Sequence, residues 1–302
     1  VYSDLLIWFY VQQKDFHRAF VQARAADRRQ KLEGMKLMEI GQISLQNKDY
    51  KAASEVFEHL VKEYPQSAIY PLARRYLVTA KEELVKNTFP IDRNAIRSLI
   101  ADYQTLLREV GRTPKTVEAV RSMALLHGFY LDEKDTAVAL LQEAVKLGRN
   151  DQKFVDKCKL DMGDIYLLKN EPWEATLIYS QVEKSAKDSP LGYDAKLRNA
   201  RLSYFKGDFQ LAQEHLDILK LATSREIAND AMDLSILIQD NTGLDSTGAA
   251  MRDYAKVELL LFQNEDTKAL ALLDDMLTRY AGHSLADEIL WQQAQVYTKR
   301  GE

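Results

Sequence analysis

The sequence predicts an all-α protein built from antiparallel helix pairs, and three observations support that prediction. Apolar residues recur at i, i+3, i+4 and i+7 along nearly the whole chain, and no stretch keeps the alternation of a strand for long. Glycine and proline are scarce, with 12 and 6 among 302 residues, which argues against collagen and against a turn-rich β fold. The breaks between periodic segments are short and polar, so consecutive helices must run antiparallel.

The breaks divide the chain into about sixteen helices of roughly 11 to 20 residues each. Every break contains glycine, proline, asparagine or aspartate, the residues that end helices and form turns. In chain order the breaks fall at Gln13–Asp15, Gly34, Asn47–Asp49, Tyr64–Pro65, Asn87–Asp92, Gly111–Pro114, Asp132–Asp135, Gly148–Asp151, Lys169–Pro172, Asp188–Pro190, Gly207–Asp208, Asn241–Ser246, Asn264–Asp266 and Ala281–Ser284. One helix, at 225–240, does not fit the alternation of pairs and is interpreted as an inserted helix or a displaced repeat partner.

Composition excludes several classes of partner. The 41 Lys and Arg residues against 45 Asp and Glu residues give a net charge of −4, spread along the chain, so we expect no nucleic-acid partner. The single cysteine, Cys158, excludes an intrachain disulfide and a cysteine-rich metal site. The apolar run Leu5–Val11 is too short to span a bilayer. We therefore expect no membrane span in this chain and no cofactor, and the oligomeric state stays open.

The chain also repeats itself at a fixed spacing. Lys14-Asp15-Phe16, followed by Ala19, returns 34 residues later as Lys48-Asp49-Tyr50, followed by Ala53. A period of 34, with a small residue in the first helix and an alanine and an aromatic residue in the second, resembles the tetratricopeptide repeat (TPR) family. Residues 34–67 match that pattern with Leu37, Ile40, Gly41, Tyr50, Ala53, Phe57, Leu60 and Pro65, and depart from it with Ser44 where the family usually has tyrosine.

Later copies keep the same internal spacing. Twelve residues separate Gly41 from Ala53, and the same number separates Gly163 from Ala175 and Ala200 from Ala212. The resemblance implies a right-handed α-solenoid of stacked antiparallel helix pairs, a TPR-like superhelix. We expect one such domain over 1–302, as a fragment of a longer chain. Its repeats would be 1–33 (partial), 34–67, 68–114 and 115–150 (both divergent), 156–192, 193–224, 225–246 (irregular helix), 247–283 and 284–302 (partial).

Gly41 lies inside a predicted helix, where glycine costs roughly 1 kcal/mol relative to alanine. The repeat pattern suggests the reason, because the two helices of one repeat must approach each other closely at this residue. We therefore expect Gly41 to be a packing residue, with the alanine of the second helix on the opposing wall. The alternative is a hinge or a ligand contact.

No motif of an enzyme is present. The sequence lacks a glycine-rich phosphate loop, HExxH and GxSxG. Adjacent carboxylates such as Asp274-Asp275 point in different directions on a helix, whereas paired acid–base catalysis needs convergent groups. The five histidines fall on separate helices or helix ends and are expected to lie on helix faces rather than bind metal: His17, His59, His127, His215 and His283. We therefore predict a protein that is not an enzyme.

The resemblance implies a function as a scaffold that binds a peptide or a partner helix in the concave groove of the superhelix. In the family the groove is lined by the first helix of each repeat. The corresponding groove candidates are Met38, Gln42, Leu197, Arg201, Tyr204, Tyr254, Glu258 and Trp291. The alternative is that several of them pack between adjacent repeats. The Lys and Asn pair that clamps a peptide carboxylate in one family subtype is absent, since the matching pairs include Met38/Gln42 and Leu197/Arg201.

The segment Tyr280–Tyr297 is similar to repeat junctions of bacterial cell-envelope TPR proteins, with Ala281 and His283 departing from the usual form. The similarity favours the periplasmic side of a bacterial envelope as the location, with the cytoplasm as the alternative. It also leaves a second functional hypothesis, in which the chain is the helical, non-catalytic portion of a larger envelope enzyme.

Overall fold

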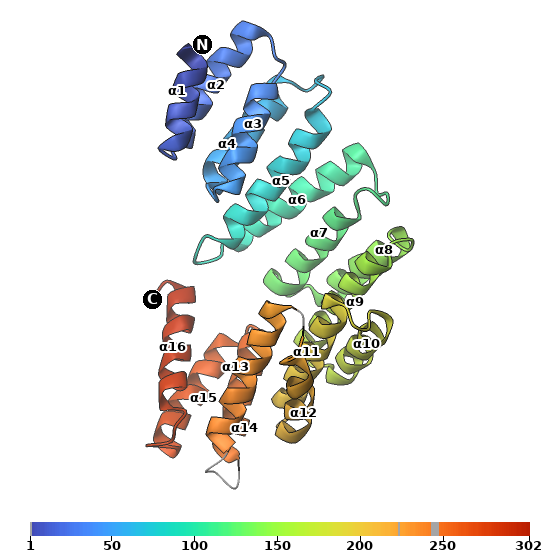
Figure 1. Cartoon of the computed structure of the whole chain (residues 1–302), viewed down its shortest axis with the longest axis vertical. Coiled ribbons are helices and arrows are strands. Elements are labelled where there is room, and N and C mark those ends of the chain that lie inside the picture. Colours follow the sequence, from blue (N-terminus) through green and yellow to red (C-terminus); the bar gives the residue numbers. More distant parts are fainter. Residues whose placement is uncertain (1, 223, 243–247) are drawn as a thin grey trace. The chain divides into compact units, whose positions relative to one another are not determined.

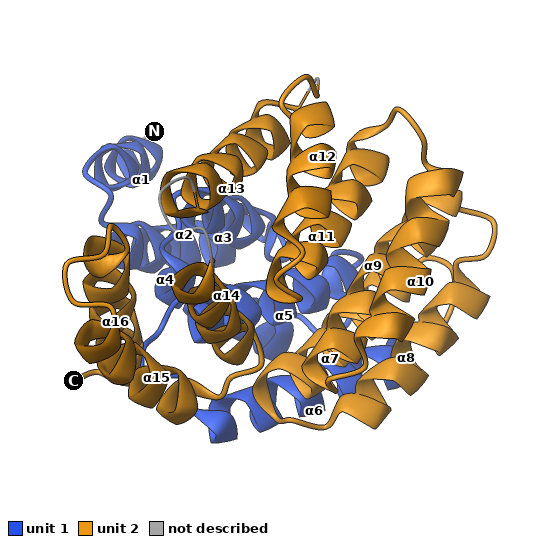
Figure 2. Ribbon diagram, turned by 90° about the horizontal axis from the view of Figure 1, so that it is seen from below, with its two compact units in different colours: residues 1–112 blue, residues 113–302 orange. Residues whose placement is uncertain are grey.

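The computed structural model describes residues 2–222, 224–242 and 248–302, and the regular secondary structure there is entirely α-helical (Figure 1). The chain forms two compact units, residues 1–112 and 113–302, which are coloured separately in Figure 2. Unit 1 contains α1 (Tyr2–Gln12), α2 (Phe16–Gln30), α3 (Met35–Gln46), α4 (Tyr50–Glu63), α5 (Tyr70–Lys86) and α6 (Arg93–Val110).

Unit 2 contains the remaining helices of the described residues. They are α7 (Val117–Tyr130), α8 (Lys134–Leu147), α9 (Gln152–Leu168), α10 (Pro172–Ser185), α11 (Pro190–Phe205), α12 (Phe209–Leu219), α13 (Arg225–Thr242), α14 (Ala249–Phe262), α15 (Asp266–Arg279) and α16 (Ala286–Arg300). Within each unit, helices adjacent in sequence pack against each other. The all-α prediction and the antiparallel pairing are therefore confirmed.

Helix boundaries fall at or within a few residues of the breaks that the sequence predicts. Part of one predicted break, residues 243–246 of Asn241–Ser246, lies outside the described residues. The two helices in the divergent middle region, α5 and α6, are 17 and 18 residues long, whereas α3 and α4 have 12 and 14. The greater length agrees with the weaker repeat pattern of residues 68–114.

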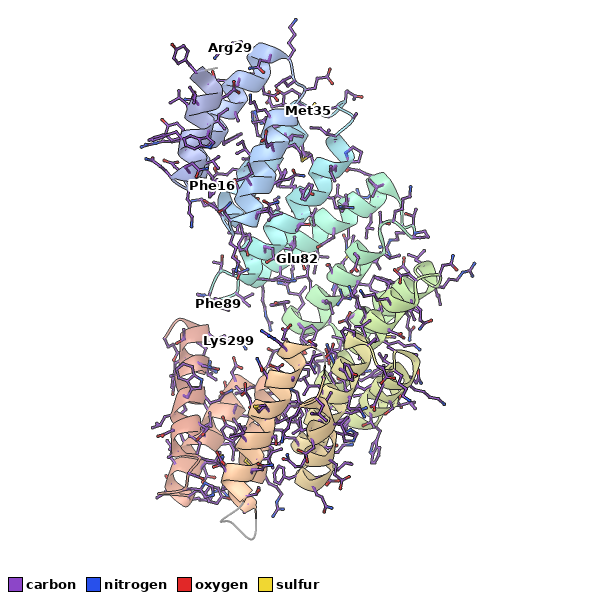
Figure 3. The ribbon with its side chains drawn as sticks, in the orientation of Figure 1. Phe16, Arg29, Met35, Glu82, Phe89 and Lys299 are labelled. Carbon is purple, nitrogen blue, oxygen red and sulfur yellow. The ribbon has the colours of Figure 1, made fainter. Side chains whose placement is uncertain are left out.

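The repeated Lys-Asp-aromatic motif forms the turn inside a repeat. Lys14 and Lys48 adopt left-handed backbone conformations, with φ of 56° and 63°. The following aspartate is the N-cap, and the Asp15 carboxylate accepts a hydrogen bond from the Arg18 N–H at 3.0 Å, as Asp49 does from Ala52 at 3.0 Å. Such a cap contributes about 1 kcal/mol. The aromatic residue then starts the second helix: Phe16, labelled in Figure 3, is buried at the start of α2, whereas Tyr50 at the start of α4 is only partly buried.

The two helices of a repeat meet at the predicted glycine. A β-carbon on Gly41 of α3 would lie 2.6 Å from the Cε1 and Cζ atoms of Phe57 on α4. A β-carbon on Gly163 of α9 would lie 2.3 Å from Cε1 of Tyr179 on α10. Both glycines are therefore packing residues, as expected.

The side chain that lies opposite each glycine differs from the prediction, which placed the alanine of the second helix there. The atoms nearest to Gly41 and Gly163 belong to aromatic rings, each four residues after the regularly spaced alanines Ala53 and Ala175. Four residues span one helical turn, so ring and alanine share a face, and the longer side chain reaches across to the glycine. The sequence pattern also missed Gly128 of α7, whose β-carbon would lie 2.3 Å from Cδ1 of Ile165.

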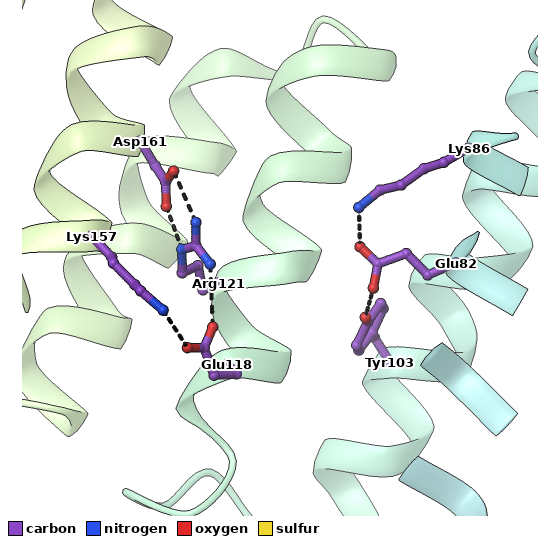
Figure 4. A network of polar contacts seen from close by, with 7 residues as sticks. All are labelled: Glu82, Lys86, Tyr103, Glu118, Arg121, Lys157 and Asp161. Atoms are coloured by element: carbon purple, nitrogen blue, oxygen red, sulfur yellow. Dashed lines mark hydrogen bonds and ion pairs between the residues drawn. The ribbon is translucent and has the colours of Figure 1, made fainter. Parts of the chain in front are cut away.

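Two networks of charged side chains link neighbouring helices, one in each unit (Figure 4). In unit 1 the buried Glu82 carboxylate of α5 accepts hydrogen bonds from the Tyr103 hydroxyl of α6 and from Lys86. In unit 2 the Arg121 guanidinium of α7 donates to both carboxylate oxygens of Asp161 on α9, a bidentate pair.

Near that pair burial raises the pKa of the Cys158 thiol to about 12, so the thiol stays protonated and unreactive at neutral pH.

Helix α13 interrupts the alternation, as the sequence indicates. It packs mainly against α12 and also contacts α11 and α14. Gln213 of α12 donates to Ser235 of α13, and Ser284, which precedes α16, donates to Asn241 near the end of α13 at 2.5 Å. Helix α13 is therefore tied to α12 on one side and to the start of α16 on the other.

The contact between Gly41 and Phe57 can be tested by a double-mutant cycle. Gly41→Ala should destabilise the protein by about 1 to 3 kcal/mol, although alanine favours a helix, because the added methyl group would overlap the fully buried Phe57 ring, which stacks on Tyr76. In a Phe57→Leu background the same change should cost much less, giving a coupling energy of about 0.5 to 3 kcal/mol. Urea denaturation of the four proteins measures it. Additive effects would show that the ring does not set the helix separation.

Candidate partner-binding cavity

A cavity of about 610 Å³ in unit 2 is lined by side chains of α11, α13, α14 and α16. These helices are labelled in Figure 1. The volume lies in the range of about 300 to 1,000 Å³ that is typical of ligand sites. Its lining residues are Arg201, Tyr204, Phe205, Asp230, Asp233, Leu234, Leu237, Tyr254, Glu258, Phe262, Glu288, Trp291 and Gln292.

Helical spacing explains why these residues converge. Tyr254, Glu258 and Phe262 follow one another at intervals of four on α14, and on α16 Trp291 and Gln292 lie three and four residues after Glu288. Residues three or four apart share a helix face, so each helix presents one face to the cavity.

The position of α14 is fixed by contacts at its C-terminal end. The Gln263 side-chain amide donates to the Leu167 carbonyl at the end of α9 at 3.0 Å, and the Asn264 amide donates to the Phe129 carbonyl of α7 at 3.1 Å. The Phe129 and Phe262 rings meet edge to face, with centroids 6.4 Å apart. These contacts hold α14 beside α11, so that Glu258 faces Tyr204.

The cavity carries an excess of negative charge. Four carboxylates line it, those of Asp230, Asp233, Glu258 and Glu288, against the single guanidinium of Arg201. Arg201 Nη2 lies 3.4 Å from Asp230 Oδ2, and both side chains are about half exposed at that pair. The charge of Arg201 is therefore shared mainly with an exposed aspartate rather than with the deeper glutamates.

Burial raises the pKa of three side chains that line the cavity, those of Glu258, Tyr204 and Tyr254. Removal from water raises the pKa of the Glu258 carboxyl, and the neighbouring Tyr204 hydroxyl and Arg201 guanidinium only partly offset this effect. Burial also raises the pKa of the Tyr204 and Tyr254 hydroxyls, and the Glu258 carboxylate adds to both shifts. Both hydroxyls thus stay protonated at neutral pH and can serve as hydrogen-bond donors.

An adjoining cavity of about 260 Å³ shares Arg201, Phe205, Asp230 and Phe262 with the first. Its carboxylates are neutralised within the chain. Arg198 donates to both oxygens of Asp194 at 3.1 Å and also to Asp164, whose other oxygen accepts a hydrogen bond from the Tyr179 hydroxyl at 2.7 Å. Here one buried guanidinium satisfies two carboxylates.

The structure brings most of the groove candidates of unit 2 together. Arg201, Tyr204, Tyr254, Glu258 and Trp291 all line the larger cavity, and Leu197 lines the adjoining one. Met38 and Gln42 belong to α3 in unit 1, where Met38 is part of the core. Leu197, Tyr204 and Tyr254 are buried, so they form the wall of the cavities, whereas Trp291 is 65% exposed.

Sequence reasoning missed the contribution of α13. Asp230, Asp233, Leu234 and Leu237 line the cavity from this helix, and Glu288 lines it from α16. The spacing of the α13 residues marks a helix face, but nothing in the spacing says which neighbour that face meets.

The described residues also bear on metal binding and on membrane insertion. No three or more His, Cys, Asp or Glu side chains among them are grouped so that they could hold a metal ion. No described helix combines the length and the hydrophobicity that crossing a bilayer requires.

Comparison with solved structures identifies the fold. A tetratricopeptide repeat protein from Parabacteroides merdae ATCC 43184 superposes with a TM-score of 0.53 at 14% sequence identity, covering 87% of this chain and 99% of the other. The chain has the fold of a TPR protein. The TPR domain of P58(IPK) matches over 98% of this chain and 87% of its own at 15% identity, but its TM-score of 0.30 is too low to bear on the fold. No family model and no curated protein sequence matches the chain.

The effect of the buried Glu258 carboxyl on the free energy of unfolding can be measured. A carboxyl whose pKa is raised on folding binds a proton more tightly in the folded state, so its contribution to stability falls as pH rises above the ordinary value of 4.5. Glu258→Gln should therefore stabilise the protein at pH 7 relative to the wild type.

Denaturant titrations across pH provide the check. The gain from Glu258→Gln should vanish below about pH 4.5, where the wild-type carboxyl is protonated in both states. The matched change at an exposed site inside α3 and outside the cavity, Glu39→Gln, should leave stability unchanged at every pH. A loss of stability at pH 7 in Glu258→Gln would contradict the prediction, because it would mean that Tyr204 and Arg201 stabilise the ionised carboxylate enough to offset its burial.

Proposed function

We propose that this chain is a non-enzymatic scaffold that binds a protein partner, as a peptide or a helix, at the unit 2 cavity. The observation that supports the proposal most strongly is the convergence of Arg201, Tyr204, Tyr254, Glu258 and Trp291 on one cavity. These positions are groove positions by the TPR repeat pattern, and aromatic and arginine side chains carry much of the energy at protein interfaces.

Repeat folds of this kind provide large inner surfaces for extended partners. The sequence carries none of the catalytic motifs sought in it, which agrees with a binding rather than a catalytic role. A bacterial envelope location belongs to the proposal because of the similarity at Tyr280–Tyr297, and fractionation of cells that express the parent protein tests it. The role as a helical part of an envelope enzyme would instead require a catalytic domain in the parent protein.

Trp291 is the residue best suited to a direct test. Because its side chain is largely exposed, Trp291→Ala should change the free energy of unfolding by less than about 0.5 kcal/mol. It should nevertheless weaken partner binding about tenfold or more, equivalent to about 1.4 kcal/mol. Partners captured by cross-linking to the wild-type chain are identified by mass spectrometry, and their affinities for both proteins are measured by calorimetry.

Trp173 provides a matched control, because it is 77% exposed on α10 and does not line the cavity. Trp173→Ala should bind partners normally. If Trp291→Ala binds as tightly as the wild type, or if both tryptophan variants lose binding equally, the cavity is not the partner site.

A further inference from the structure

The unit 2 cavity contains buried polar groups that the chain does not satisfy. The Tyr204 side chain is only 1% exposed and lines the cavity, and its hydroxyl faces the Glu258 carboxylate without forming a hydrogen bond of good geometry to any described residue. Glu288 Oε2 is also buried without a partner there. An unsatisfied buried polar group costs about 1 to 3 kcal/mol, so such groups call for an explanation.

The adjoining cavity shows how a guanidinium of the chain itself pairs with a similar set of groups. There the guanidinium of Arg198 donates to two carboxylates, Asp164 and Asp194, and the buried Tyr179 hydroxyl donates to Asp164. The larger cavity has a buried tyrosine and two deep carboxylates as well, Glu258 and Glu288. It has no guanidinium between them, because its one arginine, Arg201, pairs with the exposed Asp230.

The rest of the lining suits an organic cation rather than a metal ion. The carboxylates of the cavity do not form a group that could hold a metal. Phe205, Leu234 and Leu237 offer apolar contacts for an aliphatic stem, and the exposed Trp291 ring offers a face for a planar cation. A guanidinium is planar and presents a fork of donors that can reach two carboxylates at once, which an ammonium group cannot match.

We propose that the unit 2 cavity receives an arginine side chain of the partner, which pairs with Glu258 and Glu288 and stacks on Trp291. The inference rests on the proposed scaffold function and specifies the chemistry of its partner. A partner segment with a central arginine completes in the larger cavity the arrangement that Arg198 completes in the adjoining one. The excess of carboxylates also favours the approach of a basic segment over an acidic one.

Selection from a random-peptide display library on the full chain tests the inference even while the natural partner is unidentified. The enriched peptides should share an arginine. Its replacement by citrulline, which keeps the shape but removes the charge, should weaken binding about tenfold or more, and replacement by lysine should also weaken it. The combined change Glu258→Gln and Glu288→Gln should weaken binding of the arginine peptide to a similar extent.

A second pair of substitutions controls for the loss of two negative charges. Glu174→Gln together with Asp240→Asn removes the same charge from exposed sites outside the cavity and should leave the affinity unchanged. Since Glu258→Gln is expected to stabilise the fold, weaker binding by the cavity variant would not reflect unfolding.

The outcomes separate the two proposals. Enriched peptides that lack a basic residue but lose binding in Trp291→Ala would overturn the arginine inference and leave the scaffold function standing. Equal binding of the arginine, lysine and citrulline peptides, or equal binding to the Glu258→Gln and Glu288→Gln variant, would overturn it as well. If no peptide is enriched above background, both the scaffold function and the arginine inference fail.

Discussion

The close contact between the two helices of a repeat is the constraint on which the rest of the structure depends. Gly41 and Gly163 leave room for the rings of Phe57 and Tyr179, so that two helices pack at a short separation without a void. Because the ring fills the space that a side chain on the first helix would need, the contact fixes the register of each pair. The pairs can then stack, and residues on other faces of the first helices remain available to a ligand.

The departure from regular stacking creates the candidate site. In a regular array each pair would pack directly on the next, but α13 packs mainly on α12 while α14 contacts α11. The space bounded by α11, α13, α14 and α16 is the unit 2 cavity. Its polar groups are only partly compensated, in contrast to the paired charges around Arg198 and Arg121. Natural proteins depart from full compensation of buried polar groups mainly at functional sites.

Much of this could be predicted from the sequence, because it depends on local spacing. Apolar periodicity predicts the helices, and the twelve-residue interval between Gly41 and Ala53 predicts a close contact of two helices. The repeat register also led to Arg201, Tyr254 and Trp291, which the structure places on one cavity.

The remainder depends on tertiary placement, which local spacing does not determine. The pattern pointed to alanine rather than Phe57 opposite Gly41, because side-chain reach is not encoded in the interval. It could not assign Asp230 and Asp233 to the cavity, since the packing partners of an inserted helix follow from the helices around it. It also could not indicate that Tyr204 is buried while Trp291 is exposed, although both are groove positions of the repeat.

A crystal structure of the full chain with a peptide selected for binding would test the central claim most directly. The account predicts electron density for a guanidinium within hydrogen-bonding distance, about 2.7 to 3.2 Å, of the carboxylates of Glu258 and Glu288, with its plane against the Trp291 ring. A peptide bound elsewhere on the chain, with Tyr204 and Glu288 unchanged and still without partners, would contradict it.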